Sequence, residues 1–207
     1  MSARDLRPAL FLDRDGVLIE NRPRYVRSLA EAVPLPGAIE ALAEFARSAP
    51  DWLIVIVSNQ AGIGHGLMSR AAVDEINAWL SAQLRAGGGR LDAIYICPHR
   101  PDENCACRKP KPGLLFQAAV ELGIDLAASL LVGDSATDMQ AALAAGVRPI
   151  FVQTGLPERL EAEQAQAEAL QATICADLAE ALLQLRVNGL SRPTRAPSGD
   201  FTTLCES

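Results

Sequence analysis

The chain has 207 residues, of which 49% are hydrophobic and 21% charged, and its formal net charge is −6. This length and composition are typical of one ordinary globular domain and exclude a disordered chain, while the acidic charge gives no sign of nucleic-acid binding. Because neither a secretory leader nor an apolar run long enough to cross a membrane is evident, we expect a soluble, cytoplasmic protein without membrane partners. We also expect a monomer.

Short apolar runs alternate with amphipathic segments along the chain. In chain order, the patterns predict a strand at 8–12, a helix at 36–49, a strand at 52–57, a helix at 70–87, a strand at 91–97, a helix at 113–124, a strand at 129–134, a helix at 137–146, a strand at 147–155, and a short strand followed by a last helix within 173–185. This alternation predicts right-handed crossovers and a parallel sheet with helices on both faces, a three-layer α/β fold.

Two kinds of signal support the element assignments. Residues 52–57, WLIVIV, show no polar alternation, as expected of a strand buried on both faces. Ser69 is placed to cap the helix at 70–87, and Gly123 is placed to end the helix predicted at 113–124. We expect residues 1–187 to form the domain. The remaining residues, 188–207, are rich in Pro, Ser, Thr and Gly, which predicts a disordered tail.

Polar side chains gather where the expected strands end. Asp13 and Asp15 follow the first strand, Ser58 and Asn59 the second, and Asp134 the fourth, with Asp138 four residues further on. The carboxyl ends of parallel strands meet at one edge of a sheet, where such folds bind ligands. Carboxylates this close repel one another unless a cation lies among them, and oxygen ligands suit Mg²⁺.

These side chains are suited to phosphoryl transfer. Ser58 and Lys109 are natural phosphate contacts, and an aspartate can form a covalent phosphoryl intermediate. A second aspartate two residues along can donate a proton to the leaving oxygen and later accept one from water. The alternative is that each aspartate caps a helix or closes a turn.

One histidine and three cysteines lie close together in residues 97–107. The spacing C-x-H-x₅-C-x-C provides four ligands of the kind that tetrahedral Zn²⁺ prefers, with no position left for water, so we expect a structural zinc site. The alternative is a reduced thiol cluster with a hydrogen-bonded histidine. Arg108 and Lys109 follow directly, so zinc would brace these two cations. The expected ligands are Cys97, His99, Cys105 and Cys107.

Four stretches together resemble the motifs of the haloacid dehalogenase (HAD) superfamily of phosphatases, in order. They are FLDRDGVL, VSNQAGI, CRKPKPG and LLVGDSATDMQAA, and the resemblance covers roughly residues 8–155. It implies a Rossmann-like HAD fold and a Mg²⁺-dependent phosphomonoester hydrolase that acts through an aspartyl-phosphate. The resemblance implies that Asp13 is the nucleophile and Asp15 the acid/base. It implies that Mg²⁺ is bound by the Asp13 side chain, by the backbone carbonyl of Asp15 and by Asp134. Ser58, Asn59 and Lys109 would bind the phosphoryl group, and Arg108 would contact the substrate.

Within the superfamily, the motifs are most similar to the groups that act on D-glycero-D-manno-heptose 1,7-bisphosphate and on histidinol phosphate, which share the Cys/His loop. Many members of the superfamily carry a cap domain between the first and second motifs or between the second and third. Here ordinary helices, strands or loops already fill both intervals, so we expect no large cap domain. The resemblance favours removal of the 7-phosphate from the sugar bisphosphate. The short gap between His99 and Cys105 keeps histidinol phosphate as the alternative. A catalytically silent, zinc-stabilised binding domain is the alternative from another class.

One further segment is a candidate substrate contact. Residues 19–25, IENRPRY, are expected to form a flap beside the nucleophile. Asn21, Arg22 and Arg24 on this flap are candidates to bind a sugar or a second phosphate. Solvated surface arginines are the equal alternative.

Overall fold

The computed structural model describes residues 6–187, and these residues form one six-stranded sheet. All neighbouring strands are parallel, in the order β3-β2-β1-β4-β5-β6. The strands are β1 (Ala9–Leu12), β2 (Leu53–Asn59), β3 (Ala93–Cys97), β4 (Leu130–Gly133), β5 (Arg148–Val152) and β6 (Thr173–Cys175). The predicted α/β class and parallel sheet are confirmed.

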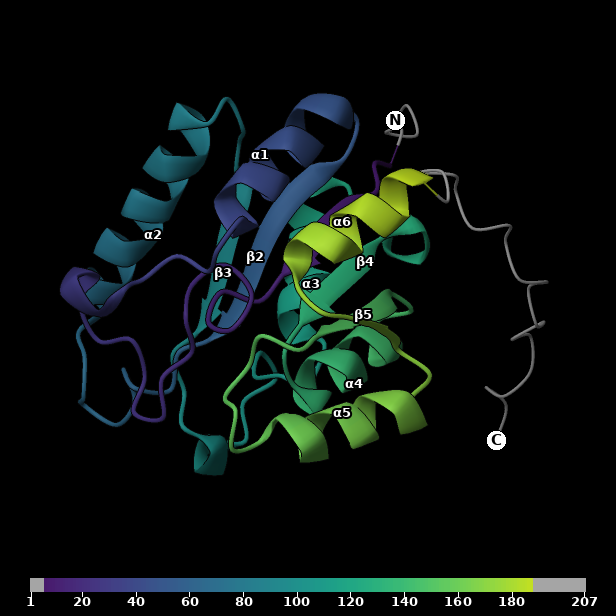
Figure 1. Ribbon diagram of the computed structural model, residues 1–207. Helices are drawn as coiled ribbons and strands as arrows, with labels where there is room; N and C mark the ends of the chain where they lie inside the picture. The colour runs from purple at the N-terminus through teal and green to yellow at the C-terminus, as the bar shows by residue number, and fades with distance from the viewer. Residues whose placement is uncertain (1–5, 188–207) are drawn as a thin grey trace, which may run out of the picture.

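Helices cover both faces of the sheet because successive strand residues point to opposite sides. Leu10 and Leu12 of β1 belong to one apolar core, whereas Ala9 and Phe11 belong to the other. The helices α1 (Ala38–Ser48), α2 (Arg70–Ala86) and α6 (Leu178–Val187) pack on the first core, and α3 (Gly113–Leu122) and α4 (Ala136–Ala144) on the second. In Figure 1, α1 and α6 lie in front of the sheet and α3 behind it.

The helix boundaries follow the capping signals. The Ser69 hydroxyl accepts a hydrogen bond of 3.1 Å from the Ala72 amide, which caps α2 as predicted. Gly123 takes a left-handed conformation at the end of α3, where a residue with a Cβ would be strained.

One helix was absent from the sequence prediction. Helix α5 (Leu160–Ala169) packs through Ala167 against Phe151 of β5 and Met139 of α4. Its sequence, LEAEQAQAEA, has almost no apolar stripe, so its periodicity is weak. Its few buried contacts are supplied by neighbours distant in the sequence.

The connections between β1 and α1 and between β2 and β3 contain no separate domain. Between β1 and α1 lies a loop with one 3₁₀ turn (Leu29–Glu31), and between β2 and β3 lies only α2 with its loops. Residues 6–187 therefore contain no large cap domain, as expected. The expected tail, 188–207, lies outside the described residues. Within the described range, no helix has the length and apolar character needed to span a membrane.

Candidate active site

The site lies where the strand order reverses direction. The chain runs outward from β1 to β2 and β3, then returns to β4 on the other side of β1. Asp13 follows β1 and Asp134 follows β4, and the Asp13 amide donates to the Val132 carbonyl at 2.9 Å. Such switch points form crevices at the carboxyl ends of the strands.

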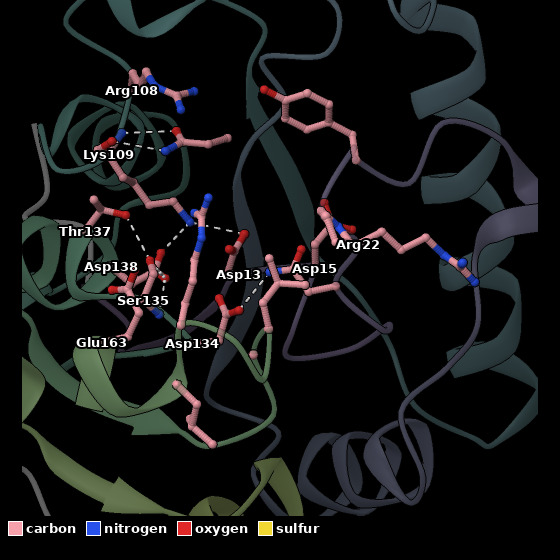
Figure 2. A pocket seen from close by; sticks show the side chains of 18 residues that line it. Asp13, Asp15, Arg22, Arg108, Lys109, Asp134, Ser135, Thr137, Asp138 and Glu163 are labelled. Carbon is pink, nitrogen blue, oxygen red and sulfur yellow. Dashed lines mark hydrogen bonds and ion pairs between the residues drawn. The ribbon is translucent and has the colours of Figure 1, made fainter. Parts of the chain in front are cut away.

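A pocket of about 330 Å³ opens at this point, a volume typical of small-molecule sites. Figure 2 shows acidic and basic side chains from several connections pointing into it. The pocket is lined by Asp13, Asp15, Asn21, Arg22, Pro23, Tyr25, Asn59, Arg108, Lys109, Asp134, Ser135, Thr137, Asp138, Gly155, Leu156, Arg159, Leu160 and Glu163.

Three carboxylates meet at the base of the pocket. One oxygen from each of Asp13, Asp134 and Asp138 lies within 4.8 Å of the others. Burial, and then the charges of Asp13 and Asp138, raise the pKa of Asp134 well above its usual value. Three crowded carboxylates fit a hard divalent cation such as Mg²⁺, which would relieve their repulsion.

The neighbouring backbone leaves room only for glycine beside this cluster. Gly16 has φ of +87°, and a Cβ there would overlap the carboxylate of Asp134. Asn21 donates a hydrogen bond of 2.9 Å to the same carboxylate. The flap residue Asn21 thus contacts a predicted metal ligand.

Lys109 places a buried positive charge beside the carboxylate cluster. Its Nζ lies 3.1 Å from Asp13 Oδ1 and 2.6 Å from Asp138 Oδ1, and it donates to the Val57 carbonyl at 2.8 Å. Burial alone would favour the neutral amine, but the two carboxylates outweigh it and raise the pKa of Lys109. Lys109 is therefore a fixed cation, as a phosphoryl-binding group requires.

Asn59 and Ser58 have different environments. The side-chain amide of Asn59 donates through Nδ2 to the Lys109 carbonyl at 3.0 Å and accepts through Oδ1 from the backbone N–H of Lys109 at 3.1 Å. It therefore holds the Lys109 backbone against the end of β2. Ser58 is only 1% exposed, and its hydroxyl accepts from Gln60 Nε2 at 3.0 Å. Asn59 lines the pocket, whereas Ser58 lies behind the lining.

Asp15 is held by donors that the sequence reading did not identify. The guanidinium of the fully buried Arg14 donates to both Asp15 oxygens at 3.1 Å and also to Asn77 Oδ1 at 3.2 Å. Gln60 Nε2 donates to Asp15 Oδ2 at 2.8 Å. The Asp15 side chain is therefore oriented separately from the carboxylate cluster.

The arginines at the mouth divide into two groups. Arg22 donates to the Glu31 carbonyl at 3.1 Å, and in Figure 2 its side chain extends away from the carboxylates. Arg24 is exposed and is not part of the pocket lining. Arg108, by contrast, lines the pocket and donates to the His99 carbonyl at 3.4 Å.

The predicted zinc ligands converge as a compact group. Cys97 Sγ lies 3.5 Å from Cys105 Sγ and 3.3 Å from Cys107 Sγ, and His99 Nδ1 lies 3.3 Å from Cys107 Sγ. A tetrahedral site with Zn–S bonds of about 2.3 Å separates its ligand atoms by roughly 3.5–3.8 Å. The four side chains thus fit a zinc ion with little adjustment.

Burial also affects the proton on one of these thiols. It raises the pKa of the Cys97 thiol to about 12 in the metal-free protein. Zinc would replace the thiol protons, because thiolates are the ligand form.

The Cys/His loop is tied to the strand that carries Ser58 and Asn59. The Gln60 amide donates to the Cys97 carbonyl at 2.7 Å, and the Gly64 amide donates to the Pro98 carbonyl at 2.9 Å. Lys109 lies two residues beyond Cys107. The position of the last cysteine therefore restrains the cation in the pocket.

The structure brings most predicted site residues together and adds others. Asp138 had been noted only for its spacing after Asp134, yet it is the closest partner of Lys109. The G-D-x-x-x-D spacing was the available signal, since it places Asp134 at the end of β4 and Asp138 in the first turn of the helix that follows. Arg14, Gln60 and Arg159 carried no comparable signal. The contact of Arg14 with Asn77, the contact of Gln60 with Asp15 and the place of Arg159 in the pocket lining arise only in the folded chain.

Comparison with known proteins agrees with this geometry. A family model described as HAD-hydrolase-like matches residues 106–181. The chain is 40% identical over 176 residues to the D-glycero-beta-D-manno-heptose-1,7-bisphosphate 7-phosphatase of Bordetella bronchiseptica, covering 85% of this chain and 96% of that protein. The enzyme of the same name from Escherichia coli is 39% identical over 183 residues, covering 84% and 93%.

A solved structure is similar as well. The D,D-heptose 1,7-bisphosphate phosphatase from B. bronchiseptica, crystallised with magnesium and phosphate, superimposes with a TM-score of 0.81 at 38% identity, covering 88% of this chain and 99% of that one. The matches span nearly the whole length of these relatives. Together with the carboxylate cluster and its buried lysine, they show that the chain belongs to the HAD-like family of phosphatases.

Proposed function

We propose that this Mg²⁺-dependent phosphatase removes the 7-phosphate from D-glycero-D-manno-heptose 1,7-bisphosphate. The observation that carries the chemistry is the meeting of Asp13, Asp134 and Asp138 with the buried Lys109 in one pocket. The name of the relatives that match nearly the whole chain supports the substrate.

Asp13 is the proposed nucleophile. Its Oδ1 accepts hydrogen bonds from the Arg14 amide at 2.8 Å and faces Lys109 Nζ, which fixes the orientation of the carboxylate. An Asp13 oxygen attacks phosphorus while the bond to the sugar oxygen breaks, giving an aspartyl-phosphate and a free sugar hydroxyl. Lys109 stabilises the charge on the phosphoryl oxygens during this transfer.

Asp15 is the proposed general acid and base. It donates a proton to the departing sugar oxygen, and then accepts a proton from the water that attacks the aspartyl-phosphate. The second step releases inorganic phosphate and regenerates Asp13. Arg14 and Gln60 hold the Asp15 side chain through both steps.

The metal would be held by the carboxylates of Asp13 and Asp134, with the backbone carbonyl of Asp15 as the third protein ligand. When bound, Mg²⁺ neutralises phosphoryl oxygens and the carboxylate cluster. Asp138 pairs with Lys109 and so positions that cation beside Asp13.

Zinc is proposed as a structural ion bound by Cys97, His99, Cys105 and Cys107. All four ligand positions are supplied by the protein, which is the pattern of structural rather than catalytic zinc. Its proposed role is to hold the loop that leads into Arg108 and Lys109.

The chemistry is tested with Asp13→Asn. Because the amide is a poor nucleophile, turnover should fall by about a thousandfold or more. Asp51→Asn, which changes an exposed aspartate before β2, is the matched control and should keep its activity. Normal turnover by Asp13→Asn would remove the mechanism.

The substrate is tested by comparing kcat/KM for heptose 1,7-bisphosphate and histidinol phosphate with the wild-type protein. We expect a clear preference for the sugar bisphosphate and release of one phosphate per molecule, from C7. A preference for histidinol phosphate would establish the alternative substrate. No turnover of either compound, or of p-nitrophenyl phosphate, with Mg²⁺ present would indicate a silent binding domain.

A further inference from the structure

The pocket lining contains cationic side chains besides the buried lysine. Lys109 is already paired with Asp13 and Asp138 at the base. Arg108 and Arg159 also line the pocket. Among residues 6–187, neither guanidinium has a carboxylate partner. These two cations are therefore available to an anionic ligand.

Arg159 approaches from a different side than Arg108. It lies in the connection between β5 and α5, whereas Arg108 follows the loop after β3. In the sheet, β3 and β5 lie on opposite sides of β1, the strand that positions Asp13. The two arginines therefore flank the nucleophile.

The Arg159 backbone is fixed while its side chain is free. Its amide donates to the Leu156 carbonyl at 3.0 Å, and its carbonyl accepts from the Glu163 amide at 2.9 Å. The Glu163 carboxylate, which also lines the pocket, instead accepts a hydrogen bond of 2.7 Å from the Ala136 amide. Arg159 is exposed, so a ligand entering the pocket can reach it.

The flap arginines are less suited to bind a second anion in this pocket. Arg22 is engaged by the Glu31 carbonyl and extends away from the carboxylates in Figure 2. Arg24 is outside the pocket lining. Arg159 is thus the better-placed free cation for a charged group at the far end of a substrate.

We propose that Arg159 binds the second, non-reacting phosphate of a sugar bisphosphate and so determines the preference for bisphosphates over monophosphates. A guanidinium matches phosphate geometry with two parallel hydrogen bonds, which gives both affinity and orientation. The inference rests on the proposed function, since it concerns the same reaction and the same pocket.

The test compares heptose 1,7-bisphosphate with heptose 7-phosphate, which lacks the second phosphate. For Arg159→Gln, kcat/KM for the bisphosphate should fall about tenfold, mainly through KM, while that for the monophosphate changes less than twofold. Arg159→Lys keeps the positive charge but not the planar guanidinium with its two parallel donors, so it should recover part of the loss.

Arg148→Gln is the matched control. Arg148 is also exposed, but it lies at the opposite end of β5. This variant should behave as wild type on both substrates.

The possible failures are distinguishable. An equal loss on both substrates, or no loss on either, would overturn the role of Arg159 and leave the proposed function intact. A wild-type protein that does not prefer the bisphosphate would instead overturn the proposed substrate, and this inference with it.

Discussion

Lys109 illustrates how one buried side chain depends on its partners. It is 3% exposed, and it is charged only because Asp13 and Asp138 surround its ammonium group. The same contacts place the ammonium beside the proposed nucleophile. Structural stability and catalysis therefore depend on the same pair of contacts.

Replacing Lys109 with Met keeps much of the side-chain volume and removes the charge. We expect kcat/KM to fall by about a hundredfold or more, because one preorganised cation is lost from the phosphoryl site. The metal-free variant should also be less stable, since the Asp13 and Asp138 charges lose their counter-ion. Steady-state kinetics and denaturant unfolding without metal measure the two effects.

Lys111→Met is the control for this prediction. Lys111 is exposed and bonds Asn104 on the surface of the same loop. It should retain both activity and stability. If the two lysine variants lose activity to the same degree, Lys109 has no specific role.

At this scale, the sequence indicated which residues carry charge but not all of their partners. Asp13, Asp134 and Lys109 were recognisable from motifs at strand ends. Arg14 lies between two of the predicted catalytic residues, yet its buried contact with Asn77 could not be foreseen. Ser58 was expected to face phosphate, and in the structure it is buried behind the pocket lining.

Among the elements, the Cys/His loop is the one whose shape we expect to depend most on a bound ion. Its backbone has a single 3₁₀ turn (Pro101–Glu103), and Asn104 has a positive φ of 48°. Apart from the contacts among the cysteines and the histidine, residues 98–106 hydrogen-bond to one another only within this turn and through the exposed side chain of Arg100. Zinc binding can supply of order 10 kcal/mol toward ordering such a segment.

Cys107→Ser should therefore lose zinc and activity together. We expect zinc content to fall below about one-tenth of the wild-type value and kcat/KM to fall tenfold or more, because the proposed brace on Lys109 is released. Elemental analysis and phosphatase assays on one preparation measure both.

Cys175→Ser removes a buried thiol at the end of β6, outside the loop, and should keep its zinc. Wild-type activity in a Cys107→Ser preparation shown to be free of zinc would refute the proposed brace.

Helix prediction depended on how strongly each helix is amphipathic. Helix α1 buries Leu42 and Phe45 on one face, and its pattern was clear from the residues alone. Helix α5 buries Ala167 alone and was not predicted. This helix matters for function, because Arg159 immediately precedes it.

For the whole molecule, the decisive feature is that the carboxylate cluster joins different parts of the sheet. Asp13 comes from the end of β1, Asp134 from the end of β4, and Asp138 from α4. Folding brings these three like charges together in a buried place, which costs stability until a cation binds. The arrangement of carboxylates that suits a divalent cation is therefore expected to lower the stability of the metal-free protein.

Asp134→Asn tests this cost. Because the folded protein raises the pKa of Asp134, that group stabilises the fold only at pH values near or below its usual pKa. The contribution is lost as pH rises through the raised pKa. At neutral pH without metal, the variant should melt a few degrees above wild type, since about 1 kcal/mol corresponds to 2–4 °C in a chain of this size.

Added Mg²⁺ should stabilise the wild-type protein and have little effect on Asp134→Asn, which should also be inactive. Thermal melts with and without Mg²⁺ measure this difference, with Asp51→Asn as the surface control. A lower melting temperature for metal-free Asp134→Asn would contradict the proposed repulsion.

The sequence by itself determined the alternation of strands and helices, the carboxylates at the strand ends and the four side chains of the candidate zinc site. These features are local: strand burial, helix capping and ligand spacing are set by residues within about ten positions of one another. For this reason they could be identified from the chain alone.

Only the tertiary structure decided the strand order, the pairing of Lys109 with Asp138, the buried contacts of Arg14, and the entry of Arg159 into the pocket. Each depends on the side of β1 on which β4 pairs and on how the helices then pack against the sheet. These contacts join residues tens of positions apart, and their energies exist only once the sheet has formed.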